Sequence, residues 1–315
     1  MARLGIVFPG QGSQYVGMGR ELFQQFAPAR ACFEEAQAVL GADISSLCFE
    51  GPREALDLTM NTQMATLTLE MAAWKVLEQR LALRTLAMAG HSLGEYSALC
   101  AAGALPFADA LRIIQARAAY QQEAVPLGVG ANAAIQRLGR DTVETICRNV
   151  TAESGLVTPS CYNAQDQTVV SGYVAPVEKV MAKALEAGAK RAVKLPLSAP
   201  FHCALLKGAA RRLDSDFERL SFRDCTTPVI PNCDPEALHS AATSRELLVR
   251  QICEPVRWLE TIEKMTAMGV DTVIEVGPKR VLSVLALRIN KGLRVFNVEN
   301  LESLQRTEEA LSGKN

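Results

Sequence analysis

The chain has 315 residues, of which 49% are hydrophobic and 21% are charged, and its formal net charge is −1. This composition is typical of a folded globular protein and excludes a disordered chain, while the near-zero charge argues against nucleic acid as the main partner. Because single cores stop growing at about 250–300 residues, the length indicates two domains, or one domain with a large insertion.

Nine cysteines are scattered without a Cys-x-x-Cys pair, and only three histidines are present, His91, His202 and His239. An odd number of cysteines without framework spacing predicts reduced thiols and a cytoplasmic protein. We expect no metal site, since a histidine-rich ligand set is absent from the sequence. Residues 1–8 are too short for a signal sequence and no apolar run of spanning length follows, so we expect no membrane contact.

The first apolar run, Leu4–Phe8, ends at a proline and a glycine and predicts a buried parallel strand. The loop that follows, residues 10–14, lacks two nucleotide-binding patterns. Tyr15 stands where a dinucleotide fingerprint needs its last glycine, and no Gly-Lys-Ser/Thr of a phosphate-binding loop follows.

Further on, Pro28 predicts a break between two helices. Apolar residues at helical spacing over 60–81 predict a long buried helix.

The clearest chemical signal is Gly90-His91-Ser92-Leu93-Gly94, which lies between an apolar run and a run of small residues. A strand, a sharp turn and a helix around Gly-x-Ser-x-Gly form the nucleophile-elbow pattern, in which glycines allow close packing and the serine occupies a strained turn. The turn places the Ser92 hydroxyl at a helix N-terminus, where free N–H groups favour developing negative charge. We predict that Ser92 is a nucleophile; a plain structural turn is the alternative.

Residues 127–198 have a pattern of their own, between two stretches of alternating strands and helices. The pattern predicts, in order, a strand, a helix, two strands, a helix and a strand, over 129–135, 141–150, 156–162, 167–173, 177–187 and 191–195. The order β-α-β-β-α-β is the ferredoxin-like arrangement. We therefore predict an α/β protein with a large subdomain of residues 1–126 and 199–315, a small inserted subdomain of residues 127–198, and a ligand cleft between them.

An activated serine needs a base within hydrogen-bond distance, and the three histidines are the candidates. His91 adjoins the nucleophile, where its side chain should point away from that of Ser92, and His239 lies in a polar connecting stretch. His202, which follows the last strand of the small subdomain, is the remaining choice. No acid is an obvious third member, since the acids between serine and histidine fit cap or turn positions, namely Asp109, Asp141 and Asp166.

The last part of the chain returns to alternating helices and strands. Apolar residues between 205 and 220 predict a helix, and Thr272–Val276 predicts a buried strand that ends at a Gly-Pro turn. Lys279 and Arg280 begin the next helix, and we expect these charges to be solvated, with docking of an acidic carrier protein as the alternative. The tail from Leu301 to Asn315 is polar, and we expect it to fray.

Two separated motifs, Phe8-Pro9-Gly10-Gln11-Gly12-Ser13-Gln14 and Gly90-His91-Ser92-Leu93-Gly94-Glu95, resemble those of the malonyl-CoA:acyl carrier protein transacylases. That family includes the acyltransferases of fatty acid and polyketide synthesis. The resemblance covers nearly the whole chain and extends to Pro200-Phe201-His202-Cys203 and Glu275-Val276-Gly277-Pro278. It implies an α/β-hydrolase-like core with a parallel sheet and an inserted ferredoxin-like subdomain.

The resemblance implies a catalytic dyad of Ser92 and His202, with the histidine oriented by a backbone carbonyl of Gln251. It also implies that the backbone N–H groups of Gln11 and Leu93 stabilise an oxyanion. Losing one such donor typically raises the barrier by about 3–4 kcal/mol.

By its spacing, Arg117 flanks the buried face of a helix, since Ile113 and Ile114 precede it by one turn. Most helical arginines are solvated, and spacing alone leaves this alternative open. The run Gln115–Ala124 resembles the family helix whose arginine binds the substrate carboxylate, which a planar guanidinium can do through two parallel hydrogen bonds.

The resemblance also assigns substrate-binding roles to Gln63, Asn163 and Phe201. Gln63 matches a Thr-Gln-Pro run of the family in which Met64 replaces the proline, and a structural role is its alternative. Two positions of the small subdomain also depart from the family pattern, since Asn132 stands where the family has methionine and Cys161 where it has asparagine. These departures leave the dyad unchanged, but we expect them to alter the shape of the acyl pocket.

The function implied by the resemblance is malonyl transfer from malonyl-CoA to the phosphopantetheine thiol of acyl carrier protein, through a malonyl-serine intermediate. We expect a monomer whose donor is a coenzyme A thioester and which holds no bound cofactor. Leu93 and Phe201 resemble the malonyl-preferring members, with another donor such as methylmalonyl-CoA as the alternative. A serine hydrolase acting on acyl carrier proteins would not need Arg117 as a carboxylate clamp. A non-catalytic carrier-binding protein would not need the dyad.

Overall fold

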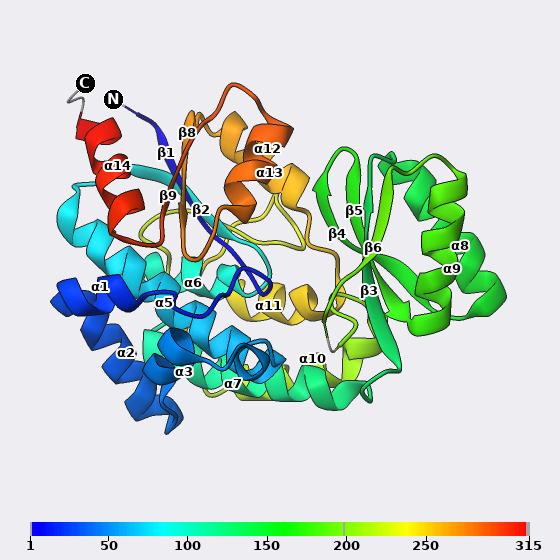
Figure 1. The fold of residues 1–315 in the computed structure, drawn as a ribbon, viewed down its shortest axis with the longest axis horizontal. Helices are drawn as coiled ribbons and strands as arrows, with labels where there is room; N and C mark the ends of the chain where they lie inside the picture. Colours follow the sequence, from blue (N-terminus) through cyan, green and yellow to red (C-terminus); the bar gives the residue numbers. More distant parts are fainter. Residues whose placement is uncertain (1, 198, 313–315) are drawn as a thin grey trace.

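The computed structural model describes residues 2–197 and 199–312. Their strands form two sheets (Figure 1). The larger sheet is parallel and five-stranded, in the order β7-β2-β1-β8-β9. The smaller sheet is antiparallel and four-stranded, in the order β4-β5-β3-β6. This arrangement confirms the predicted fold class, an α/β protein with a parallel sheet and an inserted ferredoxin-like subdomain.

The central strands of the parallel sheet are short apolar runs because helices cover both of their faces. All residues of β1 (Leu4–Phe8) and β8 (Thr272–Val276) are buried, and β2 (Thr85–Gly90) is buried over its second half. The edge strands are β7 (Val229–Ile230) and β9 (Arg294–Val298).

Side chains of β1 alternate between the two faces of the sheet, as the period of a strand requires. Ile6 and Phe8 belong to the core formed with α5 (Thr59–Arg80), α6 (Gly94–Ala101) and α7 (Phe107–Ala124). Val7 belongs to the core on the opposite face, formed with α12 (Trp258–Ala267) and α13 (Val281–Ile289). The remaining helices of this body are α1 (Arg20–Gln25), α2 (Ala27–Leu40), α3 (Ile44–Glu50), α4 (Arg53–Leu56), α10 (Lys207–Phe217), α11 (Ser244–Cys253) and α14 (Leu301–Ser312).

The small subdomain has the predicted β-α-β-β-α-β order. It consists of β3 (Gly130–Gln136), α8 (Arg140–Ser154), β4 (Val157–Ala164), β5 (Gln167–Tyr173), α9 (Val174–Glu186) and β6 (Arg191–Lys194). Residues 131, 133 and 135 of β3 face the helices α8 and α9, in a core of their own. The boundaries at residues 126/127 and 198/199 stay a prediction.

Polar contacts join the small subdomain to the large body. Arg140 Nη1 lies 2.7 Å from Glu260 Oε1, and Arg288 Nη2 lies 2.6 Å from Asp166 Oδ1. In Figure 1, strands β4 and β5 accordingly stand next to α12 and α13. These pairs fix the two walls of the space between the sheets.

The expectation of a frayed tail is wrong for residues 301–312, which form α14. Leu304 and Thr307 are buried, and Glu308 pairs with Arg80 at 2.6 Å. The polar composition of this segment hides a narrow apolar face, which is enough for a surface helix. Within residues 2–197 and 199–312, no helix has the length and apolar character needed to cross a membrane.

Close packing of α6 on β1 depends on Gly94. A Cβ atom at this position would lie 2.1 Å from the Phe8 carbonyl oxygen, which belongs to a buried strand. Gly208 is the opposite case, because it is exposed on α10 and a Cβ atom there would meet nothing within 4 Å.

We therefore predict opposite effects of two glycine substitutions on the free energy of unfolding, measured by urea denaturation. Gly94→Ala should lower it by about 3 kcal/mol or more, because backbone must move to relieve the overlap. Gly208→Ala should raise it by about 0.5–1 kcal/mol, because alanine has less conformational freedom in the unfolded chain. A Gly94→Ala protein as stable as the wild type would contradict the packing described.

Candidate active site

Ser92 lies in the turn between β2 and α6, with a φ of 55° that few residues other than glycine adopt. This conformation is the strained elbow that the Gly-x-Ser-x-Gly pattern predicts. The flanking glycines permit it, since a Cβ atom on Gly90 would lie 1.8 Å from the carbonyl carbon of Gly94. The serine hydroxyl consequently stands clear of the sheet, at the start of α6.

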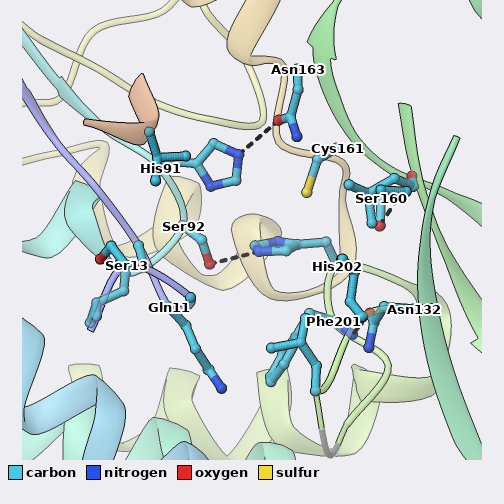
Figure 2. Close-up of a pocket in the computed structure, with 18 of the residues that line it drawn as sticks. Gln11, Ser13, His91, Ser92, Asn132, Ser160, Cys161, Asn163, Phe201 and His202 are labelled. Carbon is cyan, nitrogen blue, oxygen red and sulfur yellow. Dashed lines mark hydrogen bonds between the residues drawn. The ribbon is translucent and has the colours of Figure 1, made fainter. Parts of the chain in front are cut away.

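His202 faces the serine from the loop after β6. Its Nε2 lies 2.7 Å from Ser92 Oγ (Figure 2). Its Nδ1 lies 2.7 Å from the backbone oxygen of Gln251. Because a carbonyl oxygen only accepts, the imidazole proton is on Nδ1 and Nε2 accepts the hydroxyl proton of Ser92. The three groups therefore have the geometry of a serine, a base and the acceptor that orients the base.

The His202 ring is buried, and its environment keeps it neutral. Burial, followed by the positive charge of Arg117, lowers the pKa of His202 from 6.5 to about 3. A neutral imidazole is the form that can accept a proton from serine.

Arg117 of α7 brings a cation to the same hydroxyl. Its Nη2 lies 3.0 Å from Ser92 Oγ and 3.2 Å from Gln251 Oε1, and its Nη1 lies 2.8 Å from Gln63 Oε1. The side chain is 1% exposed, so the expectation that it merely flanks the buried face understated its burial. Burial lowers the pKa of Arg117. Its guanidinium donates to side-chain oxygens of Ser92, Gln63, Gln121 and Gln251, and no described carboxylate forms an ion pair with it. The guanidinium is held by neutral oxygens, which leaves it able to bind an anion.

Gln63 is placed to orient this arginine. Its Oε1 accepts from Arg117, and its Nε2 donates to Gln121 Oε1 at 3.0 Å and lies 3.5 Å from Gln11 Oε1. The amide chain thus links the loop after β1 to helices α5 and α7. Gln63 contacts the arginine directly.

The dyad and the arginine open into one cavity of about 310 Å³ between the two sheets. It is also lined by Gln11, Leu93, Asn163 and Phe201, so the structure brings the predicted site residues together. Gln251 reaches the site through its hydrogen bonds. The backbone N–H groups of Gln11 and Leu93 donate no hydrogen bond to any other described residue. They are free to bind an oxyanion near Ser92.

Asn163 and Asn132 hold the wall of the cavity that the small subdomain supplies (Figure 2). Asn163 Oδ1 lies 2.9 Å from His91 Nε2. His91 therefore interacts across the cavity and not with the serine. Asn132 Oδ1 accepts from the backbone N–H of Phe201 at 3.1 Å, and its Nδ2 donates to the Ala199 oxygen at 2.7 Å. Asparagine at position 132 thus anchors the loop that ends in His202.

Three polar residues that support the site received no role from the sequence, namely Glu95, Asn232 and His239. The side chains of all three residues are buried. Asn232 Oδ1 accepts from the Ser92 N–H at 2.6 Å, and Glu95 Oε1 lies 2.8 Å from His239 Nε2. The sequence signalled Glu95 as the last residue of the motif Gly90-His91-Ser92-Leu93-Gly94-Glu95 and as the one charged residue of α6. Asn232 and His239 carry no local signal, since their partners lie more than 100 residues away.

Among the described residues, no group of three or more His, Cys, Asp or Glu side chains could hold a metal ion. The chemistry that the arrangement supports is nucleophilic attack by Ser92 with His202 as base. A negatively charged group of the substrate would bind Arg117.

Residues 6–310 match the family described as the acyl transferase domain. The sequence is 40% identical over 315 residues to the malonyl CoA-acyl carrier protein transacylase of Bacillus subtilis (strain 168), with 100% of this chain and 99% of the relative covered. The structure is similar to that of the malonyl CoA-acyl carrier protein transacylase from Coxiella burnetii, with a TM-score of 0.95, 38% identity and 98% of each chain covered. A malonyl-transacylase in complex with its type II polyketide synthase acyl carrier protein gives a TM-score of 0.95 and 40% identity, with 98% of this chain and 100% of that one covered.

The neutral state of His202 gives a prediction for the free protein. Nitrogen NMR of histidine-labelled protein should show a ring with its proton on Nδ1 that does not titrate between about pH 5 and about pH 8. A His202→Asn variant identifies its resonances. Titration near 6.5, or a proton on Nε2, would contradict the hydrogen bonds described.

The lowered pKa of His202 also makes the stability of the fold depend on pH. Since the imidazole binds protons at a higher pH in the unfolded state than in the folded state, His202 contributes stability that is lost as the pH falls from about 6.5 to about 3.

Proposed function

The chain belongs to the malonyl CoA-acyl carrier protein transacylase family and transfers malonyl groups from malonyl-CoA to acyl carrier protein, and we propose that it does so through a malonyl ester on Ser92. The observation that carries the proposal is the environment of one oxygen atom. Ser92 Oγ lies 2.7 Å from a neutral base, His202, and 3.0 Å from a buried cation, Arg117, which forms no ion pair with any carboxylate of the described residues.

In the first step, His202 Nε2 takes the hydroxyl proton as Ser92 Oγ attacks the thioester carbonyl carbon. Negative charge develops on the carbonyl oxygen, and the N–H groups of Gln11 and Leu93 donate to it. The tetrahedral intermediate then collapses, the carbon–sulfur bond breaks, and the proton on His202 goes to the thiolate of coenzyme A. The malonyl group remains as an ester of Ser92.

In the second step, the phosphopantetheine thiol of acyl carrier protein takes the place of coenzyme A. His202 accepts the thiol proton, sulfur attacks the ester carbonyl, and the proton is returned to Ser92 Oγ as the ester bond breaks. The same two N–H groups stabilise the oxyanion. The chain returns to its starting state with no cofactor consumed.

Arg117 supplies the selection for a malonyl group in this proposal. A buried guanidinium is costly without an anion, and the terminal carboxylate of malonyl is an anion of matching geometry. Gln63 and Gln251 accept from the same guanidinium and so fix its plane. An acetyl group has no carboxylate and leaves this cation unpaired.

The remaining parts of the proposal concern the pocket and the state of the protein. Phe201 and Asn163 contribute to the wall against which the acyl group packs, since both line the cavity. We propose a monomer, because one chain supplies every group named. We also propose a cytoplasmic protein without a bound cofactor, which is supported by nine free cysteines.

The proposal that Ser92 is the nucleophile can be tested by substitution. Ser92→Ala should form no covalent adduct when mixed with malonyl-CoA, as measured by intact-protein mass spectrometry, whereas the wild type should gain one malonyl group. Ser97→Ala, on the helix α6 that follows Ser92, is the control and should acylate normally, because its hydroxyl contacts Glu70 and does not line the cavity. An adduct on Ser92→Ala would place the nucleophile elsewhere. Loss of the wild-type adduct to water, unaffected by added carrier protein, would indicate hydrolysis in place of transfer.

The proposal that Arg117 binds the malonyl carboxylate can be tested in the same way. Arg117→Ala should lower the rate of malonyl transfer by about 100-fold or more, since a buried charge-assisted pair is lost. Acetyl transfer, which does not use the pair, should fall much less. Arg112→Ala is the control, since Arg112 lies on the same helix but is exposed and pairs with Asp109. Equal losses for the two acyl groups would exclude a carboxylate clamp.

A further inference from the structure

Two side chains hold the peptide groups of Ser92 from opposite sides. Asn232 Oδ1 accepts from the Ser92 N–H at 2.6 Å, and Gln251 Nε2 donates to the Ser92 carbonyl oxygen at 2.9 Å. Asn232 Nδ2 also donates to the Gly90 oxygen at 2.6 Å. A residue at a φ of 55° keeps that conformation only when its surroundings impose it. These hydrogen bonds supply the constraint.

Both holding residues are fixed in turn by one carboxylate oxygen. Glu95 Oε2 accepts from Gln251 Nε2 at 3.0 Å and from the backbone N–H of Asn232 at 2.9 Å. The two hydrogens of the Gln251 amide are thereby shared between the Ser92 oxygen and the Glu95 carboxylate. Glu95 is fully buried and does not line the cavity, so it acts only through its neighbours.

The second oxygen of Glu95 is also bound. Oε1 lies 2.8 Å from His239 Nε2, and His239 Nδ1 lies 3.1 Å from Ser244 Oγ, which donates to the Ser240 oxygen at 2.7 Å. The carboxylate is therefore held in one orientation by a buried polar chain that leads away from the cavity.

Gln251 extends the effect of Glu95 to the rest of the site. Its backbone oxygen orients His202, and its Oε1 accepts from Arg117. Displacing this side chain would release the Ser92 carbonyl and disturb the helix segment that orients the base. Arg117 would still be held by Gln63 at 2.8 Å.

We propose that Glu95 is a positioning residue for the acyl transfer, which sets the distance between Ser92 and His202 through Asn232 and Gln251. This inference rests on the proposed role of Ser92 as nucleophile. Glu95 contacts neither the substrate nor the reacting atoms, and its effect is on the rate of attack, because a displacement of about 1 Å of a reacting group can cost about 100-fold in rate.

The test measures malonylation of Ser92 in the full chain by rapid quenching and mass spectrometry, over a range of malonyl-CoA concentrations. Glu95→Ala should lower the saturating rate constant by about 100-fold. The half-saturating concentration should change little, because Arg117 keeps its bond to Gln63. A stabilising role alone would leave the saturating rate constant of the folded fraction unchanged, and that result would overturn the inference.

Glu95→Gln is the conservative variant and should restore most of the rate, to within about tenfold of the wild type. Its amide oxygen can accept from both Gln251 and Asn232. Its amide nitrogen can donate to His239 Nε2 once the ring proton is on Nδ1, where Ser244 Oγ accepts it. A Glu95→Gln rate as low as that of Glu95→Ala would contradict a role based on these hydrogen bonds.

Glu70→Gln is the matched control, because Glu70 is also fully buried and contacts Ser97 of α6 but not Ser92. Glu70→Gln should leave the saturating rate constant unchanged, even if it changes the stability of the protein in urea denaturation. If Glu95→Ala does not fold, Asn232→Ala provides the second variant, and it should lower the same constant without altering half-saturation. An Asn232→Ala protein with the wild-type rate constant would overturn the inference.

The same experiment separates this inference from the proposed function. A wild-type protein that forms no adduct on Ser92 would refute the proposed function. Wild-type and Glu95→Ala proteins that acylate Ser92 equally fast would refute the positioning role alone.

Discussion

The site depends on the backbone of one residue, Ser92, which lies at a φ of 55° between a parallel strand and a helix. Only this bend turns the hydroxyl away from the sheet and toward His202, and it is possible because glycines before and after it allow the helix to touch the strand. The conformation is held by the side chains of Asn232, in the loop after β7, and Gln251, on α11, so the geometry of the nucleophile depends on distant parts of the large subdomain.

His202 has the same unusual φ of 55°, and its support comes from the other body. Asn132 of β3 binds the backbone at Ala199 and Phe201, while the Gln251 oxygen of α11 binds the imidazole. The base is thus held between the small sheet and the large one. Ion pairs across the interface, such as that of Arg140 with Glu260, therefore help to fix the dyad as well as the fold.

Local patterns predicted much of the structure, because apolar runs and turn residues act over short distances. The strands β1 and β8, the order of the small subdomain and the nucleophile Ser92 follow from such patterns. The side-chain contacts of Asn232 and Gln251 with Ser92 could not be predicted, since they join residues 140 and 159 positions apart. The burial of Arg117 was underestimated for a related reason, because helical spacing says which face a residue is on but not what covers it.

Arg117 and His202 are coupled through charge. In the free protein, burial and then the positive charge of Arg117 lower the pKa of the His202 imidazole, which keeps the base unprotonated but opposes the imidazolium that must form when Ser92 attacks. A malonyl carboxylate on Arg117 would offset this positive charge in a site where little water screens it. The imidazole would then accept the serine proton more readily when a carboxyacyl substrate is bound than when an acetyl group is. In the proposed mechanism, the arginine therefore contributes to selectivity twice, by binding the carboxylate and by allowing the base to become charged.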